Sequence, residues 1–131
     1  MTKVLTVGVY DYFHLGHLRL FKQARAHGDY LIVAAQDDDY ILKFKPASHV
    51  LYNFSERKEL LESLRCVDEV VKYTSVDSIV KDVEFDVFAV GEDQKHDGFL
   101  RAIRWCEENG KEVVRLKRTE GISSTDIKKE L

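Results

Sequence analysis

The chain has 131 residues, of which 44% are hydrophobic, so it can form one ordinary domain with a buried core. Its net charge of -3, from 20 basic and 23 acidic residues, argues against a nucleic-acid partner, because such proteins normally present a basic face. Cys66 and Cys106 fit no metal-binding spacing and are expected to be reduced thiols of a cytoplasmic protein. The N-terminus has no signal-peptide pattern, and no apolar run is long enough for a membrane span.

The first predicted strand and helix enclose a polar segment. Residues 4–7 are apolar and predict a buried strand, and residues 18–26 carry apolar side chains at helical spacing. His14 and His17, with Gly16 between them, lie where this strand leads into the helix. The N-terminus of a helix favours anions, and a glycine lets the backbone approach a ligand closely. Because imidazoles add donors for phosphate oxygens, the segment predicts a nucleotide site suited to phosphate chemistry.

Strands and helices alternate along the rest of the chain. Residues 29–35 predict a second strand after Gly28, and a long polar connection follows from Asp37 to Asn53. The later elements are predicted as a helix at 55–64, a strand at 68–72, a helix at 76–81, a strand at 86–90, a helix at 99–108, a strand at 112–116 and a short helix starting at Ser123. Five apolar strands separated by helices predict a doubly wound parallel α/β sheet, in a single domain over residues 1–131.

Three loops are expected to meet at one cleft. Gly8, Gly91 and Arg118 each follow a predicted strand. In open parallel sheets, ligands bind beyond the carboxyl ends of the strands, where the strand order reverses. Neither the Gly-x-Gly-x-x-Gly pattern of dinucleotide-binding folds nor a Walker loop occurs in the sequence.

The motifs at both ends of the chain resemble those of one enzyme family. Residues 14–17 resemble the His-x-Gly-His signature of the nucleotidyltransferase superfamily. Residues 118–125 look like the Arg-Thr-x-Gly-Ile-Ser-[Ser/Thr]-Thr motif of its cytidylyltransferase branch. Arg57-Lys58 and residues 65–70 lie between them, as they do in that branch. The resemblance covers nearly the whole chain and is greatest to the glycerol-3-phosphate type of cytidylyltransferase.

This resemblance implies an enzyme with a Rossmann-like nucleotidyltransferase fold. The implied reaction transfers CMP from CTP to a small phosphorylated alcohol, with glycerol 3-phosphate as the first choice, and releases pyrophosphate. The acceptor phosphate would attack the α-phosphorus in line without a covalent enzyme intermediate, because the attacking oxygen is already an anion and needs only positioning. The family further implies Mg²⁺ bridging the triphosphate, a homodimer, and a product used for cell-surface polysaccharide or lipid precursors.

The resemblance also assigns roles to individual residues. His14, His17, Lys43 and Lys45 would stabilise the departing pyrophosphate, Arg65 would hold the acceptor phosphate, and Arg118 would lie over the nucleotide and its phosphates. The implied nucleotide-binding residues are Gly8, Val9, Tyr10, Asp11, Gly16, Gly91, Asp93, Arg118, Thr119, Gly121, Ile122, Ser123 and Thr125.

Several of these residues also have simpler interpretations. Asp11 either helps to hold a divalent ion or is a turn residue that caps its own loop. Arg65 either binds phosphate or opposes the dipole at the end of its helix. Arg57 has no acid three or four residues away to pair with, so its simpler interpretation is a solvated charge. Ser123 also fits a plain helix cap. For His14 and His17, no further ligands occur at a zinc spacing.

The segment after the fourth predicted strand departs from the family pattern. Residues 91–94 resemble a Gly-Asp-Asp-Trp segment, but Glu92 replaces the first acid and Gln94 replaces the tryptophan. Lys95 and His96 follow, and either face the acceptor or form loop surface. The departure leaves open another acceptor, such as an amino-alcohol or modified amino-acid phosphate. The sequence is also compatible with an adenylyltransferase of the same fold, and with a non-catalytic nucleotide-binding regulator.

Overall fold

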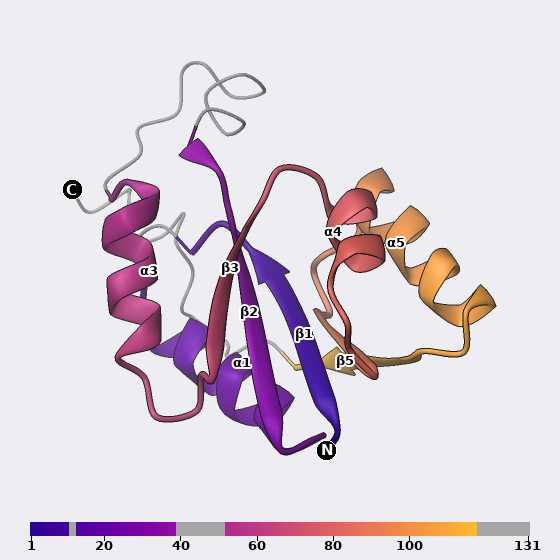
Figure 1. The fold of residues 1–131 in the computed structure, drawn as a ribbon, viewed down its shortest axis with the longest axis horizontal. Coiled ribbons are helices and arrows are strands. Elements are labelled where there is room, and N and C mark those ends of the chain that lie inside the picture. Colours follow the sequence, from indigo (N-terminus) through magenta and orange to yellow (C-terminus); the bar gives the residue numbers. More distant parts are fainter. Residues whose placement is uncertain (11–12, 39–51, 118–131) are drawn as a thin grey trace.

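A parallel sheet forms the centre of the protein, as the sequence predicts (Figure 1). The computed structural model describes residues 1–10, 13–38 and 52–117. Within them the sheet has five strands in the order β3-β2-β1-β4-β5, and every neighbouring pair is parallel. The strands are β1 (Lys3–Gly8), β2 (Tyr30–Gln36), β3 (Glu69–Tyr73), β4 (Val87–Gly91) and β5 (Glu112–Leu116).

Helices cover both faces of the sheet. They are α1 (Leu15–Arg25), α3 (Phe54–Glu62), α4 (Val76–Asp82) and α5 (Asp97–Glu108). Successive side chains of a strand point to opposite faces, so β1 sends Val4 towards the helices α1 and α3 and Leu5 towards α4 and α5. The three central strands, β1, β2 and β4, are therefore mostly apolar, as expected when both faces of a parallel sheet are covered.

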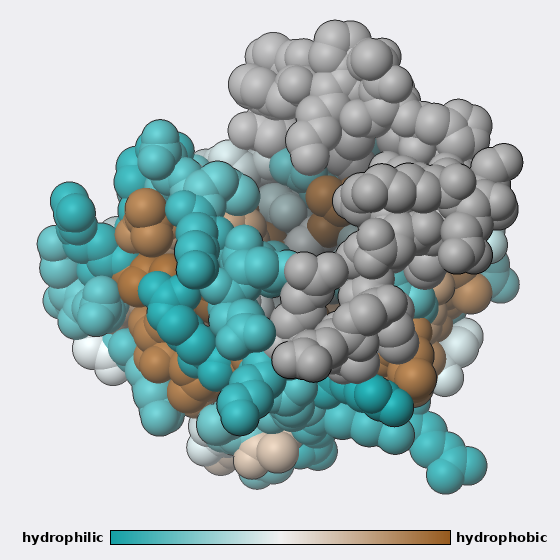
Figure 2. All heavy atoms as spheres, turned by 180° about the vertical axis from the view of Figure 1, so that it is seen from behind, coloured by the Kyte–Doolittle hydropathy of each residue, from teal (hydrophilic) through white to brown (hydrophobic). Residues whose placement is uncertain are grey.

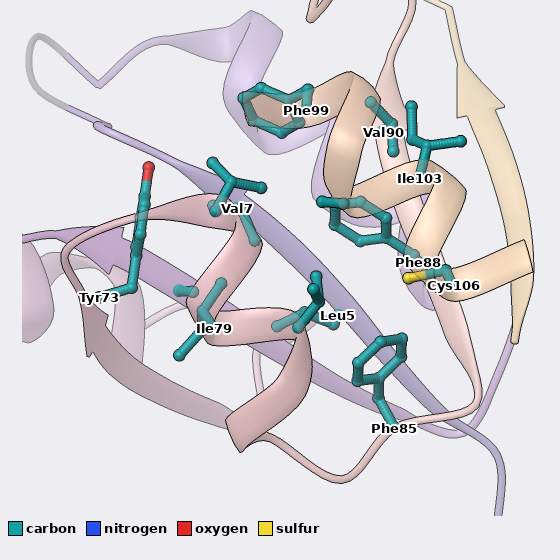
Figure 3. Packing of buried hydrophobic residues seen from close by; sticks show 14 of the residues in the cluster. Leu5, Val7, Tyr73, Ile79, Phe85, Phe88, Val90, Phe99, Ile103 and Cys106 are labelled. Carbon is teal, nitrogen blue, oxygen red and sulfur yellow. The ribbon is translucent and has the colours of Figure 1, made fainter. Parts of the chain in front are cut away.

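One of the two cores lies between the sheet and the helices α4 and α5. Figure 3 shows Leu5 and Phe88 from the sheet packed near Ile103 and Cys106 of α5, with Phe85 beside them. The second core packs buried side chains of α1 and α3 on the opposite face. On the surface seen in Figure 2, the apolar side chains of the described residues lie among hydrophilic ones. None of the described helices is long and apolar enough to cross a bilayer.

Three helices begin earlier in the chain than the sequence predicts, because residues other than the expected ones cap them. The helix α1 begins at Leu15 because His14 caps it, and α5 begins at Asp97 because His96 does. The helix α3 begins at Phe54, where Asn53 and Glu56 form a reciprocal capping box, and not after a cap at Ser55. The last predicted helix, from Ser123, lies outside the described residues.

Candidate active site

The strand order reverses between β1 and β4. The chain runs outwards from β1 through β2 to β3, and then returns to place β4 and β5 on the other side of β1. Pairing of β1 with β2 extends to Gly8–Ala35, whereas pairing of β1 with β4 covers only Val4–Val87 and Leu5–Phe88. The carboxyl ends of β1 and β4 therefore separate, which is the arrangement that opens a ligand-binding crevice in folds of this type.

The two histidines cap the helix that follows β1. Nδ1 of His14 accepts a hydrogen bond from the N–H of Gly16 at 3.0 Å, and Nδ1 of His17 accepts one from the N–H of His14 at 3.3 Å. Their rings are stacked, with centroids 4.0 Å apart. Since both Nδ1 atoms are acceptors, the neutral form of each ring carries its hydrogen on Nε2. The capping box thus fixes two N–H donors side by side at a helix N-terminus, where phosphate oxygens bind favourably.

His17 is neutral at physiological pH. Burial, together with a smaller contribution from charge repulsion by the neighbouring His14, lowers its pKa to about 4. In the free protein His17 therefore serves as a hydrogen-bond donor and not as a cation. An anionic ligand at Nε2 would favour the protonated ring, because an opposite charge nearby raises the pKa of an imidazole.

Aromatic rings hold His17 in place from two sides. The ring of Phe13 stacks on it at 5.6 Å, and the ring of Tyr10 meets it edge-on at 5.5 Å. Tyr10 has a φ of 59°, a left-handed conformation that is unusual and strained for a bulky residue. This folds its ring over Gly8, where an added Cβ would lie 2.7 Å from Tyr10 Cζ. The Tyr10 side chain is buried, so only its backbone is left for the predicted nucleotide contact.

Arg57 is fully buried, and the interpretation of this residue as a solvated charge is wrong. Its side chain is ion-paired with Asp38, donates to the carbonyl of Val9 at 2.7 Å, and donates to the carbonyl of Tyr52 at 3.1 Å. The guanidinium thus ties the segment after β1 to the segment after β2. The helical spacing rule gives no sign of Asp38, because this acid lies 19 positions away and on another element.

Arg65 lies at the opposite end of the sheet from the histidines. It is exposed, in the turn between α3 and β3. That turn adjoins the start of β2, where the N–H of Leu31 donates to the carboxylate of Asp68 at 2.8 Å. Figure 1 shows the same turn at the bottom, away from the tips of the β1 and β2 arrows. The first turn of α3 contacts the segment after β1, through Arg57 and the carbonyl of Val9, whereas Asp68, three residues after Arg65, is ion-paired at 3.3 Å with Arg25 in the last turn of α1. The role predicted for Arg65, holding the acceptor phosphate, stays a prediction.

The connection from β4 to α5 forms the other side of the opening. The N–H of Gln94 donates to the carbonyl of Gly91 at 3.0 Å and closes a tight turn. Asp93 and His96 are exposed, and Nδ1 of His96 accepts a hydrogen bond from Gly98 as the cap of α5. Gln94 is only partly exposed, and its amide is bonded to backbone groups of Gly91 and Val7.

The remaining predicted site residues lie outside the described residues. They are Asp11, Lys43, Lys45, Arg118, Thr119, Gly121, Ile122, Ser123 and Thr125. The chain leading into Arg118 is nevertheless fixed next to α1, because the amide of Gln23 bonds both backbone groups of Lys117, at 3.0 Å and 3.2 Å. In the described part of the chain, no group of three or more His, Cys, Asp or Glu could hold a metal ion.

Comparison with known proteins identifies the family. Residues 5–130 match the family described as Cytidylyltransferase-like. The chain belongs to the cytidylyltransferase-like family. Among its relatives, the glycerol-3-phosphate cytidylyltransferase of Staphylococcus aureus is 43% identical, covering 100% of this chain and 96% of that protein. The enzyme of the same name from Bacillus subtilis is 42% identical, covering 100% of this chain and 98% of that protein.

More distant relatives of this cytidylyltransferase-like protein agree with its fold. The ethanolamine-phosphate cytidylyltransferase of Dictyostelium discoideum is 36% identical over 95% of this chain, which matches 36% of that longer protein. A lipopolysaccharide core biosynthesis protein from Thermoplasma volcanium has a TM-score of 0.72 at 25% identity, covering 91% of this chain and 97% of that one. The family and the fold class predicted from the sequence are therefore confirmed.

Proposed function

We propose that this cytidylyltransferase-like protein transfers CMP from CTP to glycerol 3-phosphate, giving CDP-glycerol and pyrophosphate. The observation that carries the proposal is the pair of stacked imidazoles, each with a hydrogen on Nε2, at the N-terminus of α1 beside the separated ends of β1 and β4. Relatives named glycerol-3-phosphate cytidylyltransferase, which match the full length of the chain, support this choice of substrates.

In this mechanism the triphosphate lies over the N-terminus of α1. An oxygen of the acceptor phosphate forms a new bond to the α-phosphorus, and the bond between that phosphorus and the oxygen bridging to the β-phosphate breaks. Negative charge then grows on the departing pyrophosphate. His14 and His17 donate from Nε2 to its oxygens, and these hydrogen bonds strengthen as the charge grows. Interactions that are stronger in the transition state than in the ground state accelerate the reaction.

The other residues act by position or by charge. Arg57 keeps the segments after β1 and β2 together, so that the loop carrying the histidines has a fixed start. Lys43 and Lys45 are proposed to meet the β- and γ-phosphates, and Arg118 and Ser123 the α-phosphate region, as in the family that the sequence resembles. Gly8, Gly91 and Asp93 border the opening and are proposed to contact the nucleoside. No step of this mechanism is assigned to Arg65, and its holding of the acceptor phosphate stays a prediction.

Magnesium, subunit number and location are parts of the same proposal. Mg²⁺ commonly binds through one or two carboxylates together with substrate phosphates. Asp11 beside a triphosphate is a donor set of this kind, and Asp11 would be its protein ligand. When bound, the ion would neutralise charge on the phosphate oxygens. We also propose a cytoplasmic homodimer, for which light scattering coupled to size-exclusion chromatography would give the subunit number.

A pyrophosphate-release assay tests the reaction. The protein is incubated with CTP, ATP, GTP or UTP in combination with glycerol 3-phosphate, phosphoethanolamine or phosphocholine. We expect rapid release only with CTP and glycerol 3-phosphate, and mass spectrometry should identify CDP-glycerol. If CTP and phosphoethanolamine were the one pair that reacted, phosphoethanolamine would replace glycerol 3-phosphate as the proposed acceptor, in agreement with the name of the Dictyostelium discoideum relative. Turnover with ATP alone, or nucleotide binding without turnover of any pair, would refute the proposed function.

A further inference from the structure

The ladder between β1 and β4 is interrupted where the two strands separate. Their pairing includes Leu5 opposite Phe88. If this register continued, Gly8 would lie opposite Gly91, and the N–H of Gly91 would donate directly to the carbonyl of Val7, as in any parallel ladder. Val7 and Gly91 are both buried, so these two backbone groups need other partners once the strands move apart.

The side chain of Gln94 takes the place of this missing rung. Its Oε1 accepts a hydrogen bond from the N–H of Gly91 at 2.9 Å, and its Nε2 donates to the carbonyl of Val7 at 2.9 Å. A single primary amide therefore lies between the two strand ends and satisfies both backbone groups. Gln94 and Val7 are 87 positions apart in the sequence and meet at the point where the strand order reverses.

The turn that carries Gln94 is anchored on its other side as well. Its own N–H bonds the carbonyl of Gly91, so both backbone groups of Gly91 are bonded to this one residue. The N–H of Glu92 donates to the carbonyl of Leu116 in β5 at 3.0 Å. Held between β5 and β1, the turn has little freedom to move, and Asp93 and His96 on it are placed at a set distance from the loop after β1.

We propose that Gln94 is a positioning residue for CTP: its amide sets the separation of the β1 and β4 ends between which the nucleotide binds. This proposal rests on the proposed function. It also assigns a task to the glutamine that stands where similar enzymes have tryptophan. Only a group with one donor and one acceptor can bridge an N–H and a carbonyl at this spacing. A glutamate has only acceptors when ionised and would repel the carbonyl of Val7, whereas a protonated glutamic acid can replace the amide.

The test compares Gln94→Glu with Gln94→Met by CTP kinetics between pH 5.5 and 8.5, each relative to the wild type at the same pH. At pH 8 we expect the KM for CTP to rise about tenfold in both variants, with kcat changed less, because a buried polar group loses its partner. Ionised Glu92 and Asp93 nearby would raise the pKa of the introduced acid. The Gln94→Glu defect should therefore shrink as the pH falls, while the Gln94→Met defect should stay constant.

Gln36→Glu is the matched control. It removes one amide-to-carbonyl hydrogen bond, to Thr74 at 3.2 Å, at the end of β2, away from the reversal of strand order. Its KM for CTP should remain that of the wild type. A pH-independent defect in Gln94→Glu, or a wild-type KM in Gln94→Met, would overturn the proposal.

A second readout needs no substrate. Amide hydrogen exchange at Gly91, followed by NMR, should accelerate about tenfold in Gln94→Met because its acceptor is lost. Unchanged exchange would show that the bridge does not form in the folded protein, and would overturn the proposal. Failure of the proposed function would instead appear as absence of CTP turnover in the wild type, while the exchange at Gly91 still responded to Gln94→Met.

Discussion

Replacing Arg57 by methionine tests whether this buried guanidinium joins the segments that follow β1 and β2. The substitution keeps an unbranched chain of similar length but removes the charge and every donor. It leaves Asp38 without its ion-pair partner and the carbonyls of Val9 and Tyr52 without a donor. A single substitution therefore removes the contacts that hold the segments after β1 and β2 together.

The expected loss follows from these contacts. Removing one partner of a buried ion pair costs about 3–5 kcal/mol, because a charge is left uncompensated. The side chain of Asp38 is 31% exposed, so water partly solvates the carboxylate that remains. We therefore expect a loss at the lower end of this range, about 3 kcal/mol in the free energy of unfolding. For a domain of this size, that loss lowers the melting temperature by about 10 °C.

Urea denaturation at pH 7, followed by circular dichroism, measures this loss directly. Lys58→Met is the matched control on the same helix, because the ion pair that Lys58 makes within the described residues is a surface pair with Glu62 at 3.4 Å. Such pairs contribute about 0.3–0.5 kcal/mol. Equal losses for Arg57→Met and Lys58→Met would refute the reasoning. Arg57→Lys should fall between them, since one ammonium group cannot serve three separated acceptors.

Three further predictions concern the loop around the histidines, and a fourth concerns the chain leading into Arg118. His17→Gln keeps an acceptor for the capping box but no imidazole, so turnover should fall by several orders of magnitude while circular dichroism is unchanged; near-normal rates would remove its catalytic role. The pKa of His17 is lowered to about 4, so as the pH falls the unfolded state binds a proton at this ring before the folded state does. The free energy of unfolding of the wild type should therefore fall by about 3 kcal/mol between pH 6.5 and 4. Denaturation curves of His17→Gln should lack this loss. Gly8→Ala should cost about 2 kcal/mol and reduce kcat by displacing Tyr10, and wild-type melting and kinetics would contradict the close packing seen there. Gln23→Ala should weaken CTP binding measured by calorimetry, because it releases the backbone of Lys117 from α1. An unchanged affinity would show that this contact does not contribute to CTP binding.

The sequence predicted most elements well because each has a strong local pattern. The apolar runs that became β2 and β4 needed no knowledge of the partner strands, since a strand buried on both faces is apolar throughout. The helix starts were less accurate, because histidine is not a usual N-cap and yet caps both α1 and α5. Where the cap was a common type, at Asn53, the prediction still chose the neighbouring Ser55.

The choice between the two middle arginines shows where the sequence was insufficient. Arg57 and Arg65 are eight positions apart, and the sequence favours Arg65 as the phosphate ligand. The direction of α3 against the sheet decides which of them contacts the segment after β1, and that direction depends on contacts between distant parts of the chain. Asp38, which neutralises Arg57, gives no local signal of that pairing.

The sequence by itself determined the order of strands and helices, the family, and the histidines at the start of the first helix, because periodicity and motif spacing are properties of neighbouring residues. Only the tertiary structure decided that Arg57 is buried and that Arg65 lies at the far end of the sheet. It alone also placed the amide of Gln94 between Val7 and Gly91. These features depend on groups far apart in the chain, which the packing of the sheet and helices brings within hydrogen-bonding distance.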